Sequence, residues 1–344
     1  MKATYFKYLL QFKRPAGTSR GVLQTKETYF LILEKEGKKY VGECALFRGL
    51  SIDDKPDYEE KLLWLVQNIN LPKAKLLDFL RDYPSIIFGL EQALISMENE
   101  QPFCLYPSDF TQGKANIPIN GLVWMGDKNF MLQQIKDKIS AGYSVIKLKI
   151  GAINFEDEIN LLNFIRNKFK YDNITIRLDA NGAFSVSESL EKLKKLSDYD
   201  IHSIEQPIKA GQIEAMKDLC AQSPIPIALD EELIGYNHLF NKKNFLKTIN
   251  PQYIILKPAL HGGFVGTKSW INAAQNADIN WWITSALESN IGLNAIAQFT
   301  YNLGVNLPQG LGTGGLFTNN FESPLYTSNA SLYYDPEKVF VFDL

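Results

Sequence analysis

Histidine and cysteine are scarce in this sequence. It has 3 histidines in 344 residues, and its 3 cysteines, Cys44, Cys104 and Cys220, lie far apart. This spacing fits neither a site with paired cysteine ligands nor a framework of disulfides. Any metal site is therefore expected to use oxygen ligands.

An excess of charge of one sign is also absent. The 36 lysine and arginine residues nearly balance the 38 aspartates and glutamates, which leaves a net charge of −2. No basic stripe or long run of like charge occurs, so neither nucleic acid nor a membrane surface is an expected partner. A small molecule is the expected partner.

Long apolar runs are missing as well. No stretch approaches the roughly 20 apolar residues that a membrane helix needs. The first residues, "MKATYFKYLLQFKRPAG", lack the unbroken apolar region and small-residue cleavage site of a signal peptide. We therefore expect a soluble cytoplasmic protein.

The first hundred residues have a pattern of their own. The stretch "ETYFLILEKEGKKYVGECAL" predicts two strands joined by a Gly-Lys turn, and "YEEKLLWLVQNI" and "PSIIFGLEQALISMENE" have the apolar spacing of helices. Strands followed by helices are typical of a small α+β unit. We assign residues 1–112 to it.

From residue 116 onward a short apolar strand, a loop and an amphipathic helix recur about every 24 to 30 residues. The predicted strands end near Asn120, Lys149, Asp179, Glu205, Asp230, Lys257, Ser285 and Gln309. Eight strands with seven helices between them predict an α/β fold, a (β/α)7β barrel of the TIM type over residues 113–316. Residues 1–112 would be its N-terminal capping domain, and residues 317–344 are expected to return to that domain.

Acidic residues close three consecutive predicted strands. "ITIRLDANG", "IHSIEQP" and "IPIALDEE" place Asp179, Glu205 and Asp230 at strand ends. In such barrels the active site is built at the carboxyl ends of the strands, so these carboxylates should converge. One such acid alone is more often a helix cap, but three in successive repeats favour a shared site. Three oxygen ligands suit Mg²⁺, with Mn²⁺ as a possible substitute.

Two lysines interrupt the otherwise apolar strand "YSVIKLKIG". Side chains alternate along a strand, so Lys147 and Lys149 should point to the same side, into the barrel mouth. Lys257 closes the strand after Asp230 and should face them across the acids. Neighbouring positive charges and a metal should lower the pKa of a lysine here and make it a base. The plainer interpretation is a set of ordinary salt bridges.

The motifs "KLK", "LDANG", "EQP", "ALDEE" and "LKPAL" resemble those of the enolase superfamily, in its muconate-lactonizing subgroup. The resemblance implies a capping domain on a (β/α)7β barrel. It also implies that Asp179, Glu205 and Asp230 are metal ligands, that Lys149 abstracts a proton next to a carboxylate, and that Lys257 is its partner across the site. Lys147 would support Lys149.

Further stretches, "SALESNIGLNAIAQ", "PSIIFGLEQAL", "INGLVWMG" and "GLGTGGLF", resemble the o-succinylbenzoate synthase family of that subgroup. This resemblance implies dehydration of a dicarboxylate, 2-succinyl-6-hydroxy-2,4-cyclohexadiene-1-carboxylate, in menaquinone biosynthesis. The succinyl carboxylate needs a second anion site, for which helix N-terminal amides and glycine-rich backbone are candidates. The predicted substrate-binding residues are Ser285, Ser289, Asn290, Gly312 and Gly314, with Arg20 in a loop over residues 15–23 that is either a lid or a solvated hairpin loop.

Two other functions remain open at this point. A racemase of N-succinylamino acids or an epimerase of dipeptides would use the same two lysines. Dipeptide epimerases of this family usually carry an Asp-x-Asp on the eighth strand, whereas no acid occurs here between Val305 and Leu316. The second is a barrel without enzymatic activity that keeps a structural metal, which lysines on both sides of the acids disfavour. The sequence leaves the oligomeric state open.

Overall fold

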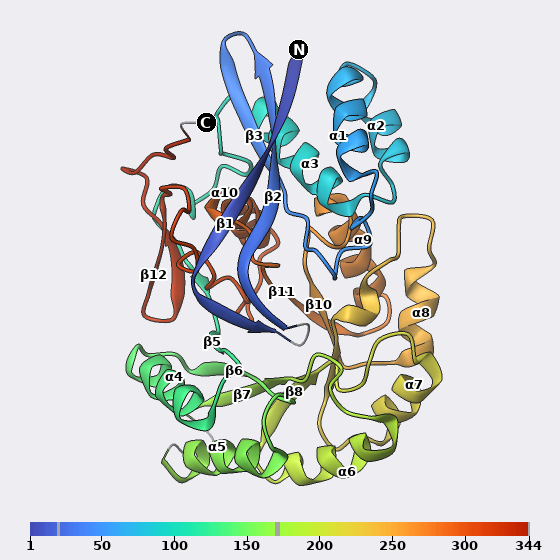
Figure 1. The fold of residues 1–344 in the computed structure, drawn as a ribbon, viewed down its shortest axis with the longest axis vertical. Coiled ribbons are helices and arrows are strands. Elements are labelled where there is room, and N and C mark those ends of the chain that lie inside the picture. Colours follow the sequence, from blue (N-terminus) through green and yellow to red (C-terminus); the bar gives the residue numbers. More distant parts are fainter. Residues whose placement is uncertain (19–20, 169–172, 343–344) are drawn as a thin grey trace.

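The computed structural model describes residues 1–18, 21–168 and 173–342. Its centre is a parallel sheet of seven strands whose neighbours follow one another in chain order (Figure 1). These strands are β5 (Gly121–Val123), β6 (Val145–Lys149), β7 (Thr175–Asp179), β8 (Ile201–Glu205), β9 (Ile227–Leu229), β10 (Tyr253–Leu256) and β11 (Asn280–Ile283).

A two-residue segment closes this sheet into a barrel. Gln309 forms a parallel bridge with Ile119, next to β5, and Gly310 forms one with Thr284, directly after β11. The amide of Asn120 donates to Gln309 O at 3.0 Å, and the amide of Gly310 donates to Ile283 O at 2.8 Å. The segment therefore lies between the first and the seventh strand and acts as the eighth.

Seven helices connect the eight strands. They are α4 (Lys128–Ser140), α5 (Phe155–Lys168), α6 (Val186–Ser197), α7 (Ile213–Gln222), α8 (Lys242–Ile249), α9 (Gly263–Gln275) and α10 (Asn290–Asn302), and a 3-10 turn, η1 (Glu231–Leu233), follows β9. Apolar side chains of the strands and helices form one large buried core. The predicted (β/α)7β barrel with an N-terminal capping unit is confirmed.

The N-terminal unit is an antiparallel sheet packed against helices. It consists of β1 (Lys2–Thr18), β2 (Gly21–Lys35), β3 (Lys38–Cys44), α1 (Tyr58–Gln67), α2 (Lys73–Phe79) and α3 (Pro84–Glu98). Strand β1 and helix α2 were not predicted. Over residues 2–17 of β1 only Leu10 and Ala16 are buried, so few of its side chains follow the alternation of buried and exposed positions that marks a half-buried strand. Pairing with β2 along most of its length makes it a strand.

Two glycines let α3 approach β3 closely. A Cβ atom on Gly42 would lie 1.8 Å from the carbonyl oxygen of Gly89, and one on Gly89 would lie 2.4 Å from Cys44 Sγ. Real Cβ atoms do not come so near to a backbone oxygen. The absence of two side chains therefore sets the distance between helix and sheet.

The N-terminal sheet meets the barrel over its carboxyl end, as the blue strands of Figure 1 show. Leu10 and Phe47 form a buried cluster with Leu260, Leu287 and Phe317. This contact places residues of the N-terminal unit above the mouth of the barrel.

The last part of the chain contacts both units. Phe317 bridges Phe12 of β1, and their rings lie 4.6 Å apart. The hairpin of β12 (Leu325–Ser328) and β13 (Ser331–Tyr334) instead pairs with β4 (Ile117–Pro118), at the start of the barrel. The domain boundaries at 112 and 316 stay a prediction. Among the described residues, no helix combines the length and the apolar character needed to span a bilayer.

We expect Gly42→Ala to destabilise the protein by about 1 to 3 kcal/mol, because the added methyl group would overlap the backbone of α3. Thermal unfolding of purified variants measures this. Gly315→Ala is the matched control, since a Cβ there would have no atom within 4 Å. Equal melting temperatures of the two variants would contradict the close packing of α3 on β3.

Candidate active site

Register places three polar side chains at one level of the barrel. Lys149 pairs with Asp179 across β6 and β7, and Asp179 pairs with Glu205 across β7 and β8. Neighbours in a parallel sheet point to the same face, so all three point into the barrel mouth. Asp230 directly follows β9 and Lys257 directly follows β10. The structure thus brings together the residues that the strand ends predicted.

Ion pairs connect the lysines and the carboxylates. Lys147 Nζ lies 2.6 Å from Glu205 Oε2 and 3.0 Å from Asp179 Oδ2. Lys149 Nζ donates to the same Asp179 oxygen at 3.0 Å. Lys257 Nζ donates to Asp230 Oδ2. The lysines therefore sit on both sides of the carboxylates, with Lys147 between two of them.

The carboxylates of this cluster act on the pKa of two of its lysines. Burial alone would lower the pKa of Lys147, but attraction by Asp179, Glu205 and Asp230 outweighs it and raises the pKa. Burial also opposes the charge on Lys257, yet Asp230 and other carboxylates raise its pKa. The acids thus stabilise these two ammonium groups, whereas the lowered pKa predicted for a lysine beside a bound metal stays a prediction.

The carboxylates themselves respond in opposite directions. Burial and then the charge of Asp179 raise the pKa of Glu205 well above its usual range, although Lys147 opposes this. For Asp179 burial also favours the neutral form, but the lysines, Lys147 first, hold its pKa low. Adjacent carboxylates in a buried site compete for the available positive charge. The cluster is therefore one that a cation would stabilise.

Three residues support the lysines and were not assigned roles from the sequence. Asn181 accepts a hydrogen bond from Lys149 Nζ at 2.7 Å and donates to Glu231 Oε1 at 2.9 Å. His261 Nδ1 accepts from the backbone amide of Lys257 at 3.1 Å, which places that loop. Asn181 and Glu231 belong to the motifs "LDANG" and "ALDEE", so their positions beside the acids were a usable signal. His261 directly follows the motif "LKPAL", so its position near the end of a predicted strand was also a usable signal.

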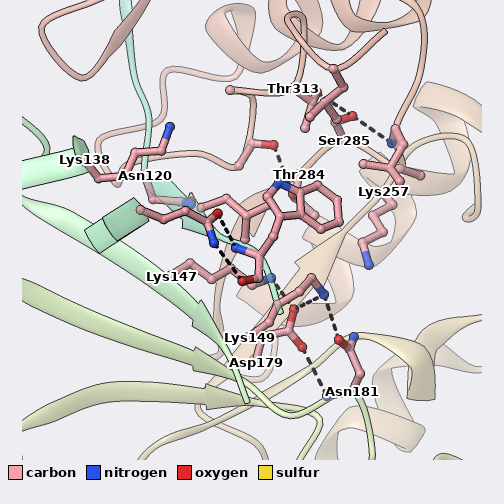
Figure 2. A pocket seen from close by; sticks show the side chains of 18 of the residues that line it. Asn120, Lys138, Lys147, Lys149, Asp179, Asn181, Lys257, Thr284, Ser285 and Thr313 are labelled. Atoms are coloured by element: carbon pink, nitrogen blue, oxygen red, sulfur yellow. Dashed lines mark hydrogen bonds and ion pairs between the residues drawn. The ribbon is translucent and has the colours of Figure 1, made fainter. Parts of the chain in front are cut away.

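A cavity of about 350 Å³ opens above the cluster. Lys147, Lys149 and Lys257 line it, and Figure 2 shows Lys149 beside Asp179 and Asn181 with Lys257 reaching in from another segment. Apolar wall residues come from both units and include Phe47, Leu50, Leu122, Trp124 and Leu316. The cavity can hold a small molecule with an apolar body against the charged floor.

Ser285 and Gly312 line the cavity as predicted for substrate contacts. The Ser285 hydroxyl donates to Glu288 Oε2 at 2.6 Å, and its oxygen accepts from the Leu287 amide at 3.0 Å. Thr313 Oγ1 lies 2.9 Å from the same oxygen. Because the single proton of Ser285 is already given to Glu288, this hydroxyl has none to donate to a substrate carboxylate.

Ser289, Asn290 and Gly314 do not line the cavity. The N-terminus of α10 instead binds a carboxylate of the protein itself, because Ser289 Oγ and the Gly292 amide donate to Glu43 Oε2 at 2.6 and 3.0 Å. Asn290 bonds the C-terminal segment through Asn320 and Phe321. The predicted anion site at this helix start is thus filled by Glu43. Arg20 lies outside the described residues.

Comparisons with known proteins show which family this chain belongs to. The model of the family "Enolase C-terminal domain-like" matches residues 131–313, more than half of the chain. An o-succinylbenzoate synthase of Desulfotalea psychrophila is 44% identical over 94% of this chain and 96% of that protein. The chain belongs to the enolase superfamily.

Solved structures of the superfamily share the whole architecture. The crystal structure of MenC from Desulfotalea psychrophila superposes with a TM-score of 0.86 at 39% identity, over 97% of this chain and 99% of that one. A dipeptide epimerase from Enterococcus faecalis, solved with Mg and a dipeptide, has a TM-score of 0.81 at 19% identity, over 97% of this chain and 96% of that one. The second likeness shows the fold alone.

The carboxylate oxygens of this site are the kind of ligand that a hard divalent cation prefers. Among the described residues, Glu205 Oε1 and Asp230 Oδ1 are buried and make no hydrogen bond. Free buried carboxylate oxygens are costly unless a cation or donor meets them. In this same part of the chain no three His, Cys, Asp or Glu side chains are arranged to hold a metal as they stand. Ammonium groups partner these carboxylates in the structure.

We expect Asp230→Asn to weaken Mg²⁺ binding. Loss of a supporting partner alone costs metal sites about 10-fold to 100-fold in affinity, so a lost ligand should cost at least that. Calorimetric titration with Mg²⁺ measures the affinity without reference to activity. Glu232→Gln is the control. Both oxygens of Glu232 already accept hydrogen bonds, from Gln206 and Gly211, so this variant should keep its Mg²⁺ affinity. Unchanged Mg²⁺ affinity in Asp230→Asn would remove Asp230 from the ligand set.

Proposed function

We propose that this chain is an o-succinylbenzoate synthase that dehydrates 2-succinyl-6-hydroxy-2,4-cyclohexadiene-1-carboxylate to 2-succinylbenzoate in menaquinone biosynthesis. The observation that carries the proposal is the pair of lysines, Lys149 and Lys257, which reach one cavity from strands separated by three acid-bearing neighbours. The 44% identity to a synthase over almost the whole chain supports the choice of reaction.

Lys149 is assigned as the base. Its amine takes the proton on the ring carbon next to the carboxylate, and the electrons of that C–H bond delocalise into the carboxylate. The C–O bond at the neighbouring carbon then breaks, the departing oxygen takes the proton from Lys149, and water leaves as the ring becomes aromatic. One lysine can do both steps when the proton and the hydroxyl leave from the same face.

Lys257 and Lys147 are assigned electrostatic roles. Lys257 keeps its ammonium beside Asp230 and faces the developing negative charge from the opposite side. Lys147 lies between Asp179 and Glu205, so its positive charge is fixed at the floor of the cavity. Together they lower the cost of forming a dianion from a weakly acidic C–H group.

The expected cofactor is Mg²⁺, with Mn²⁺ as a possible substitute, held by Asp179, Glu205 and Asp230. When bound, the ion would supply positive charge against the substrate carboxylate oxygens as negative charge develops there. The free oxygens of Glu205 and Asp230 support this placement.

Incubation of the purified protein with the cyclohexadiene substrate and Mg²⁺ tests the proposal. We expect the absorbance of an aromatic product to appear, to stop in excess chelator, and to return when Mg²⁺ is restored. Failure to form 2-succinylbenzoate would refute the proposed reaction. Full activity in the chelator would refute its dependence on a metal.

We expect Lys149→Ala to lose nearly all turnover, because it removes the base. Lys257→Ala should lose about 10² to 10³ in kcat, the usual cost of one stabilising charge. Turnover and deuterium exchange from solvent into the reactive position of the substrate, both at saturating Mg²⁺, separate the roles. Any detectable exchange should depend on Lys149, and near-normal turnover in Lys149→Ala would show that the base is another residue.

A racemase of N-succinylamino acids or an epimerase of dipeptides is the second candidate, because it would need the same two lysines. The eighth strand argues against free dipeptides. This strand and the loop after it give the cavity Gly310, Gly312 and Thr313 and no acid that could meet a substrate ammonium group.

We therefore expect free dipeptides to bind more weakly than succinylated dianions by more than about 100-fold, since an unpaired buried charge costs about 3 to 5 kcal/mol. Competition of both ligand types against the cyclohexadiene substrate measures this. Epimerisation of dipeptides at rates that rival dehydration would reverse the order of the two functions.

A further inference from the structure

A buried glutamine connects the ends of β8 and β9. Gln206 directly follows Glu205, the last residue of β8, and it has no exposed surface. Its Oε1 accepts hydrogen bonds from the backbone amides of Asp230 and Glu232, each at 3.2 Å. Its Nε2 donates to Glu232 Oε2 and to Ile208 O, each at 3.0 Å. Both lone pairs of the side-chain oxygen and both protons of the nitrogen are therefore used.

The sheet fixes Asp230 less firmly than it fixes the other two acids. Asp179 and Glu205 are register partners on β7 and β8. The register partner of Glu205 on β9 is Ala228, and Asp230 lies just beyond the end of that strand. The hydrogen bond from the Asp230 amide to Gln206 therefore takes the place of strand pairing in setting where Asp230 lies relative to Glu205.

The backbone of Gln206 is in the left-handed region, with φ of 41°. That region costs free energy for a residue with a Cβ atom, whereas glycine adopts it freely. Hydrogen bonds hold the conformation, from the Gln206 amide to Ala228 O at 2.9 Å and from the Gly182 amide to Gln206 O at 2.6 Å. Because glycine would suit this backbone better, the advantage of glutamine here must come from its side chain.

We propose that Gln206 is a positioning residue that sets the separation of the Glu205 and Asp230 carboxylates and thereby makes the cation site select Mg²⁺ over the larger Ca²⁺. The inference rests on the proposed function for its metal ligands and adds the basis of their selectivity. Mg²⁺ requires ligands near ideal octahedral positions at about 2.1 Å, whereas Ca²⁺ accepts varied positions at about 2.3 to 2.6 Å. A carboxylate that is free to shift therefore weakens the binding of Mg²⁺ more than that of Ca²⁺.

Calorimetric titration of Gln206→Met with Mg²⁺ and with Ca²⁺ tests the proposal. The substitution keeps an unbranched side chain but removes the acceptor for the amides of Asp230 and Glu232. We expect the Mg²⁺ affinity to fall about tenfold, as it does when a supporting partner of a metal ligand is lost, and the Ca²⁺ affinity to fall less than about threefold. A general loosening of the fold would lower both affinities alike. The ratio of the two affinities therefore separates positioning from stability.

Exchanging two side chains should restore this ratio. In the double variant Gln206→Glu/Glu232→Gln, an oxygen at position 206 again accepts both backbone amides, the amide group at position 232 donates to the new carboxylate, and only the hydrogen bond to Ile208 O is lost. The carboxylate moved next to Glu205 attracts both divalent ions, so its charge raises both affinities and leaves their ratio unchanged. We expect a ratio within about twofold of that of the unsubstituted protein.

Gln298→Met is the matched control. Gln298 of α10 also has no exposed surface, and its Oε1 accepts from the amides of Leu105 and Tyr106 at 2.8 and 3.0 Å. Its Nε2 donates to Phe103 O and to Asn294 Oδ1, each at 2.8 Å. None of these five residues lines the cavity. The control should lower the melting temperature and leave both ion affinities unchanged.

An unchanged ratio of affinities in Gln206→Met would overturn the proposal, and so would a double variant that binds both ions but keeps the lowered ratio. Should Gln206→Met not fold, Gln206→Gly decides instead, because glycine favours this backbone conformation and removes the same hydrogen bonds. Its ratio should fall in the same way, and an unaltered ratio would refute the positioning role.

Turnover of the unsubstituted protein is measured separately from these titrations. A protein that binds Mg²⁺ but forms no 2-succinylbenzoate would refute the proposed reaction, while the titrations still decide the role of Gln206. A protein that binds no Mg²⁺ would refute the proposed metal site and this inference together.

Discussion

The site depends on positive charge, because three carboxylates lie at the ends of adjacent barrel strands. Asp179, Glu205 and Asp230 are all almost completely buried, and like charges held so close favour neutralisation or a cation. The lysines of β6 and of the loop after β10 meet this need from two sides. The arrangement that balances the charge is also the arrangement that can remove a proton next to a carboxylate.

The sequence predicted the site best where a charged residue lies at the end of a predicted strand. Charged residues within apolar strands are rare, so Lys149 and Asp179 stood out and the barrel repeat gave their common location. Contacts between distant segments had no such signal. Ser289 fits a helix N-terminal anion site, but its partner is Glu43, 246 positions away along the chain. Likewise β1 is a strand because of its pairing with β2, and little in its own apolar pattern indicates that.

The cavity belongs to neither unit alone. Its floor is the charged end of the barrel, whereas Phe47 and Leu50 of its wall come from the segment after β3. The same segment packs on barrel loops through an apolar cluster that includes Leu260 and Leu287. Apolar burial at this junction therefore holds the two units together and shapes the space for a ligand, so the affinity for substrate and the docking of the N-terminal sheet are physically linked.

The eighth strand consists of two residues, Gln309 and Gly310, and its bridges to Ile119 and Thr284 are single pairs. Beyond it the wall continues as a loop through Gly312 and Thr313. This seam lies between the first and the seventh strand, whereas the carboxylates lie on strands on the other side of the barrel. Replacements in the loop can alter the shape of the cavity without disturbing the sheet that carries the acids. Evolution of new ligand preferences from this chain would be easiest there, because divergence at the seam leaves the buried acids and their lysine partners in place.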